Sequence, residues 1–205
     1  PCQPQLEAPE FGTVSATSGN THDIVIFGCN VGYELSCGPV LECLADGSWS
    51  DYPPFCIPNQ CESLTDPVHG SVDVPTGWTG TTRSFECEFG YTLTGDASTT
   101  CEPSGFWSTP PPTCVPNPCP TLAHPAFGSV SALEGATGAV RSYLCDPGYT
   151  RYGSDIRECL PDGSWSGSAP TCVANSCKSL KAPKHGFVDS VSAVTGETRT
   201  YSCEE

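Results

Sequence analysis

Fifteen cysteines dominate the residues of this 205-residue chain that could do chemistry. A thiol can act as a nucleophile, bind a metal or pair as a disulfide, and the compartment decides which of these persists. In a reducing compartment so many cysteines would be a hazard. Small domains with little apolar core instead use disulfides in oxidising surroundings. The composition therefore predicts an extracellular chain, either secreted or the ectodomain of a surface protein.

The remaining inventory argues against catalysis. The chain has four histidines, His22, His69, His124 and His185. Two of them, His69 and His185, precede a glycine at the position that Phe11 and Phe127 occupy elsewhere in a regular repeat, which favours a packing or turn role. The Gly-x-Ser-x-Gly, His-Glu-x-x-His, phosphate-loop and EF-hand patterns do not occur. We predict a segment that is not an enzyme and that uses no metal and no cofactor.

The cysteines themselves follow a repeat, which sets the domain organisation. Successive units begin at Cys2, Cys61, Cys119 and Cys177, and the later cysteines of each unit follow the first at nearly constant distances. Four residues separate consecutive units. The spacing predicts tandem modules, named here module 1 (2–56), module 2 (61–114), module 3 (119–172) and module 4 (177–205), the last expected to be incomplete at its C-terminal end.

Other residues keep step with the cysteines and indicate β structure. An aromatic residue stands two positions before each second cysteine, a Gly-Tyr pair follows that cysteine in modules 1 to 3, and a Gly-x-Trp precedes the fourth. Gly or Pro interrupts every long stretch of modules 1 to 3, which excludes helices of normal length. Residues 24–27 and 141–144 are predicted strands, and Asp46-Gly47 and Asp162-Gly163 are predicted tight turns.

This combination of cysteine order, Gly-Tyr and Trp resembles the sushi module, also called the complement control protein module. The resemblance implies an all-β fold of tandem, small, disulfide-rich modules arranged as an elongated rod. Four cysteines alone permit three pairings. The resemblance implies pairing of first with third and of second with fourth: Cys2 with Cys43, Cys29 with Cys56, Cys61 with Cys101, Cys87 with Cys114, Cys119 with Cys159, and Cys145 with Cys172.

Three cysteines depart from this scheme and are predicted to be unpaired or to bridge to another chain. Cys37 is a fifth cysteine in module 1, where the sister modules carry Gly95 and Gly153. A bridge to another chain or to a neighbouring part of the parent protein is the interpretation for Cys37, and a buried or capped thiol without a role is the alternative. The partners of Cys177 and Cys203 are expected beyond Glu205.

Two features suggest a surface that binds a partner. Trp78, the one tryptophan outside the repeat, lies between two glycines in a predicted loop, although it could instead fold back on its own module. Formal charge runs −7, −6, −2 and 0 from residues 1–57 through 58–115 and 116–173 to 174–205, where Lys178, Lys181 and Lys184 cluster. The expected partners are other proteins or copies of this chain, and not nucleic acid. Plain solubility is the alternative meaning of the charge.

Membrane contact and glycosylation leave weaker signals. No apolar run is long enough to span a bilayer, so no direct membrane insertion of this segment is expected. No Asn-x-Ser/Thr sequon occurs, whereas the Ser/Thr/Pro-rich stretch 108–113 could carry O-linked glycans.

Three functions are consistent with these features. The leading hypothesis is a non-enzymatic structural or adhesive array, a fragment of a larger secreted or cell-surface protein that serves as a spacer or as a subunit of an extracellular fibre or coat. The first alternative is a protein-recognition array of the complement-regulator or adhesion-receptor type. The second alternative is the non-catalytic arm of a secreted protease. The fold cannot choose among them, because function depends on sites added to the scaffold.

Overall fold

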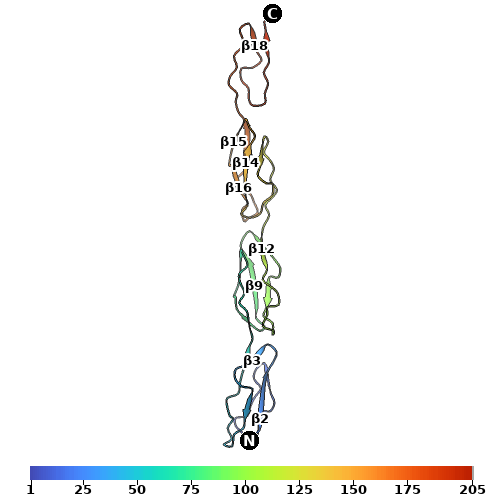
Figure 1. Ribbon diagram of the computed structural model, residues 1–205, viewed down its shortest axis with the longest axis vertical. Coiled ribbons are helices and arrows are strands. Elements are labelled where there is room, and N and C mark those ends of the chain that lie inside the picture. The colour runs from blue at the N-terminus through green and yellow to red at the C-terminus, as the bar shows by residue number, and fades with distance from the viewer. Residues whose placement is uncertain (205) are drawn as a thin grey trace. The chain divides into compact units, whose positions relative to one another are not determined.

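The computed structural model describes residues 1–204, which form short strands and loops and contain no helix (Figure 1). None of the described residues therefore belongs to a helix that could cross a membrane. The all-β prediction is confirmed. The described chain divides into two compact units: unit 1 contains Pro1–Glu88 and Leu93–Cys114, and unit 2 contains Phe89–Thr92 and the described residues from Val115 onward.

Unit 1 contains two antiparallel three-stranded sheets, of order β1-β2-β4 and β11-β9-β7, and two strand pairs, β3-β5 and β6-β8. The strands of module 1 are β1 (Gly12–Val14), β2 (Ile24–Cys29), β3 (Tyr33–Leu35), β4 (Val40–Glu42) and β5 (Cys56–Pro58). Those that follow are β6 (Gln60–Cys61), β7 (Gly70–Val72), β8 (Gly77–Trp78), β9 (Thr82–Cys87) and β11 (Ser98–Thr100). A further pair, β10 (Tyr91–Thr94) with β12 (Thr113–Pro116), includes residues of both units.

Unit 2 repeats the arrangement with the sheet β13-β14-β16 and the pairs β15-β17 and β18-β19. Its strands are β13 (Gly128–Val130), β14 (Val140–Cys145), β15 (Tyr149–Tyr152), β16 (Ile156–Glu158), β17 (Thr171–Ala174), β18 (Gly186–Val188) and β19 (Tyr201–Cys203). The register also repeats, because Val130 lies opposite Tyr143 as Val14 lies opposite Phe27. The strands expected at 24–27 and 141–144 are parts of β2 and β14.

Each core is small and is closed by disulfides. In module 1 the buried apolar side chains are Leu6, Val25, Phe27, Leu41 and Trp49, which pack around the Cys2–Cys43 bridge. Across residues 1–204 the structure contains six disulfides: Cys2–Cys43, Cys29–Cys56, Cys61–Cys101, Cys87–Cys114, Cys119–Cys159 and Cys145–Cys172. Each bridge closes a loop of 27 to 41 residues. By reducing the chain entropy of the unfolded state, a loop of this length stabilises the fold by about 3.5 to 4 kcal/mol. Cross-links therefore provide much of the stability that so small a core cannot.

The aromatic-or-His residue before a glycine marks one recurring turn. Phe11, His69, Phe127 and His185 all have positive φ, between 58° and 61°. The following glycine cannot be replaced easily, since a Cβ at Gly12 would lie 2.5 Å from the carbonyl oxygen of Gly28. The ring of Phe11 stacks on Tyr33 with centroids 4.6 Å apart. In modules 1 and 3 this turn therefore presents a phenylalanine ring to the Gly-Tyr tyrosine.

Candidate functional site

The linker between modules 1 and 2 is fixed by hydrogen bonds to both modules. The carbonyl of Gly32 accepts from the N–H of Asn59 at 2.8 Å and from the hydroxyl of Thr79 at 2.9 Å. Thr79 N–H donates in turn to the Asn59 carbonyl at 2.8 Å. Strands β5 and β6 also extend into the linker, 57–60. We call this region the first junction, and its three hydrogen bonds hold the linker against both modules.

The same three bonds recur in unit 2. The carbonyl of Gly148 accepts from Asn175 N–H at 2.8 Å and from the Thr195 hydroxyl at 2.8 Å, and Thr195 N–H donates to the Asn175 carbonyl at 2.9 Å. We call this region the third junction. Gly90, Asn117 and Thr137 form the equivalent set, also within unit 2. Each Gly, Asn and Thr stands one module repeat from its counterpart, so one backbone arrangement serves every junction.

Trp78 lies at the first junction and differs from the other three tryptophans. The indole N–H groups of Trp49, Trp107 and Trp165 donate to backbone carbonyls at 2.7 to 2.9 Å, and those side chains pack in or against the cores. The Trp78 residue is 46% exposed, and its indole N–H has no hydrogen-bond partner among residues 1–204. Its side chain is therefore free to contact a partner.

The position of Trp78 differs from the expected loop. Residues Gly77–Trp78 form β8, in which Trp78 lies opposite Gln60 of the linker strand β6. A two-residue strand leaves no pattern in the sequence, and its partner is the linker itself. Pairing with β6 fixes the backbone of Trp78 next to the linker.

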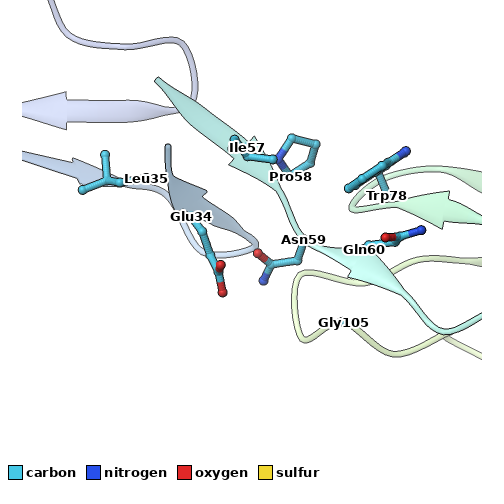
Figure 2. Close-up of a pocket in the computed structure, with 8 residues that line it drawn as sticks. All are labelled: Glu34, Leu35, Ile57, Pro58, Asn59, Gln60, Trp78 and Gly105. Atoms are coloured by element: carbon cyan, nitrogen blue, oxygen red, sulfur yellow. The ribbon is translucent and has the colours of Figure 1, made fainter. Parts of the chain in front are cut away.

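A pocket of about 400 Å³ opens beside Trp78 (Figure 2). Trp78, Pro58 and Ile57 give it an apolar end, and Glu34 and Asn59 give it an acceptor end. Figure 2 shows the Glu34 carboxylate and the Asn59 amide extending to the same side of the linker strand. The lining residues are Glu34, Leu35, Ile57, Pro58, Asn59, Gln60, Trp78 and Gly105.

The acceptor end lacks a hydrogen-bond donor that the unit 2 junctions possess. Oδ1 of Asn117 accepts from the Thr92 hydroxyl, and Oδ1 of Asn175 accepts from the Thr150 hydroxyl, both at 2.6 Å. In the first junction Glu34 occupies the threonine position, one module repeat before Thr92.

An ionised carboxylate has no proton to donate to the asparagine. Oδ1 of Asn59 is consequently buried without a donor, while its Nδ2 donates to the Pro103 carbonyl at 3.2 Å. Sequence reasoning missed Glu34 and Asn59, although the asparagine that recurs in every linker was a visible signal.

Within residues 1–204, no positively charged side chain pairs with Glu34 at the acceptor end of the pocket. Glu34 forms no ion pair with any residue of that described range. Module 1 has no Lys or Arg, and the single arginine of module 2, Arg83, donates its Nε–H to the Thr76 carbonyl. The pocket therefore combines an exposed aromatic ring with uncompensated acceptor groups.

The other predicted site residues lie elsewhere. Cys37, Cys177 and Cys203 are exposed free thiols, and the one polar contact of Cys37 within the described chain is the Ser36 hydroxyl at 4.0 Å. Lys178, Lys181 and Lys184 are exposed residues of unit 2, without ion pairs to residues in the described range. Across residues 1–204 no cluster of three or more His, Cys, Asp or Glu side chains could hold a metal ion.

Comparison with known proteins gives matches along almost the whole chain. E-selectin of Canis lupus familiaris is 34% identical over 218 residues, covering 99% of this chain and 35% of that protein. P-selectin of Mus musculus is 32% identical over 219 residues, covering 99% of this chain and 28% of that protein. A mouse protein named for sushi, von Willebrand factor type A, EGF and pentraxin domains is 29% identical, with 7% of its length covered. The chain thus spans about a third of the length of the selectins it matches.

The family model adds the location of the repeats. The model described as "Sushi repeat (SCR repeat)" matches residues 2–56, 61–114 and 119–172. Together with the selectin relatives, these matches place the segment among extracellular or cell-surface sushi repeats. The chain belongs to the sushi repeat family.

Proposed function

We propose that this segment is a protein-recognition array of a cell-surface or secreted adhesion protein, and that the first junction is its contact surface. The observation that carries the proposal is Trp78, whose exposed ring and free indole N–H border a pocket. Tryptophan and tyrosine are enriched among the few residues that supply most of the affinity in protein interfaces. The selectin relatives support an adhesive role without identifying the ligand.

The test is binding of a fluorescent multimer of this chain to a panel of live cells, measured by flow cytometry. Trp78→Ala should weaken binding to responsive cells by roughly tenfold or more, since truncation of a central aromatic contact costs about 2 kcal/mol. Tyr152→Ala is the matched control, because Tyr152 is an exposed aromatic of unit 2 outside the pocket. Mild trypsin treatment of the cells should abolish binding if the ligand is a protein. Equal binding by the Trp78 and Tyr152 variants would exclude the first junction as the contact.

A spacer role, alone or within a fibre or coat, is the second candidate. It is favoured by the Gly–Asn–Thr hydrogen bonds that recur at each linker, since fixed linkers transmit a constant step from module to module. Small-angle scattering would test the expected rod: a maximum dimension near that of a compact 205-residue globule would exclude it.

Contact between copies is a variant of the same proposal. The lysines Lys178, Lys181 and Lys184 would then face the acidic modules 1 and 2 of another copy, with Cys37 available for a bridge. Sedimentation velocity at low and high salt would test it, because such contacts weaken as the Debye length falls. No observation favours the arm of a protease.

A further inference from the structure

The first junction lacks a hydrogen bond that the other two junctions have, and it contains a pocket that is rich in hydrogen-bond acceptors. At the other two junctions the linker asparagine is satisfied by a threonine hydroxyl, whereas Glu34 leaves Oδ1 of Asn59 buried without a donor. Most buried polar atoms in proteins have a partner, and exceptions call for an explanation such as strain or a functional role. The substitution also coincides with Trp78, whose counterparts are Ala136 and Val194. Both changes in this junction line the same pocket.

We propose that the acceptor end of this pocket takes the guanidinium of an arginine from an exposed segment of a partner protein, while Trp78 and Pro58 hold the neighbouring apolar side chain. The inference rests on the proposed recognition function and names the chemistry of its ligand. The two halves match the two ends of the pocket, which has a volume of about 400 Å³.

Arginine fits the acceptor end better than other donors do. Its five N–H groups form a planar fork that binds a carboxylate through two bonds and leaves donors for a neighbouring carbonyl oxygen. The Glu34 carboxylate and Asn59 Oδ1 are such a pair of acceptors. Glu34 is exposed and can pair with an incoming arginine directly, whereas Asn59 Oδ1 is buried and would have to become accessible for the second bond to form.

Charge selects the same ligand class. Residues 1–57 carry seven acidic and no Lys or Arg residues, and residues 58–115 carry seven acidic residues and one arginine. The single arginine, Arg83, donates to the backbone of Thr76 and forms no ion pair with the residues that the structure describes. The unit 1 surface therefore attracts a basic segment and repels an acidic one.

The experiment is an NMR titration of the labelled chain with two peptides, in low salt and with a chelator present. The probes are acetyl-Gly-Arg-Leu-Gly-amide and the same peptide with citrulline, a neutral isostere, in place of arginine. The arginine peptide should shift the Glu34 carboxyl carbon and the Trp78 indole N–H together, and it should bind about tenfold tighter than the citrulline peptide, as expected for hydrogen bonds to a charged group.

Variants separate the two ends of the pocket. Glu34→Thr should remove the preference for arginine while the rest of the spectrum shows a folded chain. Trp78→Ala should weaken both peptides. Equal affinity for arginine and citrulline, shifts scattered over the acidic surface, or an arginine preference that survives Glu34→Thr would each overturn the inference.

Two further outcomes show which part of the proposal is wrong if it fails. If cells still bind the chain through Trp78 but the arginine peptide does not, the recognition function stands and this ligand class is wrong. Self-association that requires both Glu34 and the lysines Lys178, Lys181 and Lys184 would make a second copy the occupant, which also overturns the assignment to a different protein.

Discussion

The first and third junctions share a backbone and differ in two side chains. In each, a glycine carbonyl accepts from a linker asparagine and from a threonine of the following segment. The third junction adds a Thr150–Asn175 hydrogen bond and carries Val194, whereas the first carries Glu34 and Trp78 at these two positions. The comparison separates what holds a linker in place, which is repeated, from what could recognise a ligand, which occurs once among the three junctions.

Reduction of the disulfides should lower the stability of the chain more than any substitution discussed below, because both junctions depend on modules that the disulfides stabilise. Each of modules 1 to 3 contains two bridges, together worth about 7 to 8 kcal/mol, which exceeds what so small a core can replace. Circular dichroism and tryptophan fluorescence before and after a strong reductant should show loss of the cooperative melt. A melt that stays cooperative after full reduction, checked by thiol counting, would mean that the cores suffice.

Replacing the junction glycine should affect the first junction more than the third. Gly32 has φ +92°, and an added Cβ would lie 2.8 Å from the Cα of Pro103, which is backbone. Gly148 also has φ +92°, but there the near atoms belong to the Thr195 side chain, the nearest 2.6 Å away, which can move if it gives up its hydrogen bond to the Gly148 carbonyl.

Gly32→Ala should therefore lower the free energy of unfolding by about 2 kcal/mol or more, and Gly148→Ala by roughly 1 to 2 kcal/mol. Urea unfolding of both variants measures which substitution lowers the free energy of unfolding more. The reverse order would show that contact with Pro103 does not hold the first junction together.

Two valine variants test the position from which a threonine donates to the linker asparagine, one in the third junction and one in the first. Thr150→Val should cost roughly 0.5 to 1 kcal/mol, because Asn175 Oδ1 loses its threonine donor at a site that water can reach. Glu34→Val should cost nothing or stabilise slightly, since Asn59 Oδ1 has no donor to lose. Thermal melts, with hydrogen exchange at the linker amides, measure both. A cost for Glu34→Val equal to that for Thr150→Val would mean that Glu34 supports the first junction after all.

The smallest expected effect on stability comes from the tight turns that contain Asp46 and Asp162. The hydroxyls and backbone N–H groups of Ser48 and Ser164 donate to these carboxylates and hold their pKa values below the ordinary 3.8. A folded pKa below the unfolded one contributes stability above the unfolded pKa that is lost as pH falls through the folded pKa.

The turn of module 2 carries Ser104 at this position and should lack this acid sensitivity. NMR titration should show that Ser48→Ala raises the pKa of Asp46 and leaves that of Asp162 unchanged. An Asp46 pKa that Ser48→Ala does not move would remove the hydroxyl as its cause.

The fold class followed from the sequence because cysteine spacing and period-two strands are local signals. Ile24–Phe27 alternates exposed and buried residues, and the buried Phe27 stands two before Cys29 as expected. The strand at Gly77–Trp78 left no such signal, since two residues cannot establish a period. The family resemblance identified the array but not the site.

The site required comparison of positions that are far apart in sequence. Glu34 follows the second cysteine of module 1 and Asn59 lies in the linker, and neither is unusual alone. Their meaning depends on the Thr92–Asn117 and Thr150–Asn175 hydrogen bonds, which form only in the folded chain and leave no mark in the sequence. Trp78 was identified from the sequence as a partner-binding residue because it falls outside the repeat, and that assignment stays a prediction.

One variant tests the central claim most directly, namely that the first junction gives up internal stability for recognition. Glu34→Thr restores the residue that the other two junctions carry at this position. Unfolding and multimer binding to cells should be measured on the same preparation. The free energy of unfolding should rise by about 1 kcal/mol as Asn59 Oδ1 gains a donor, and cell binding should fall roughly tenfold as the carboxylate is lost. Unchanged or stronger binding, whatever the stability, would contradict the claim.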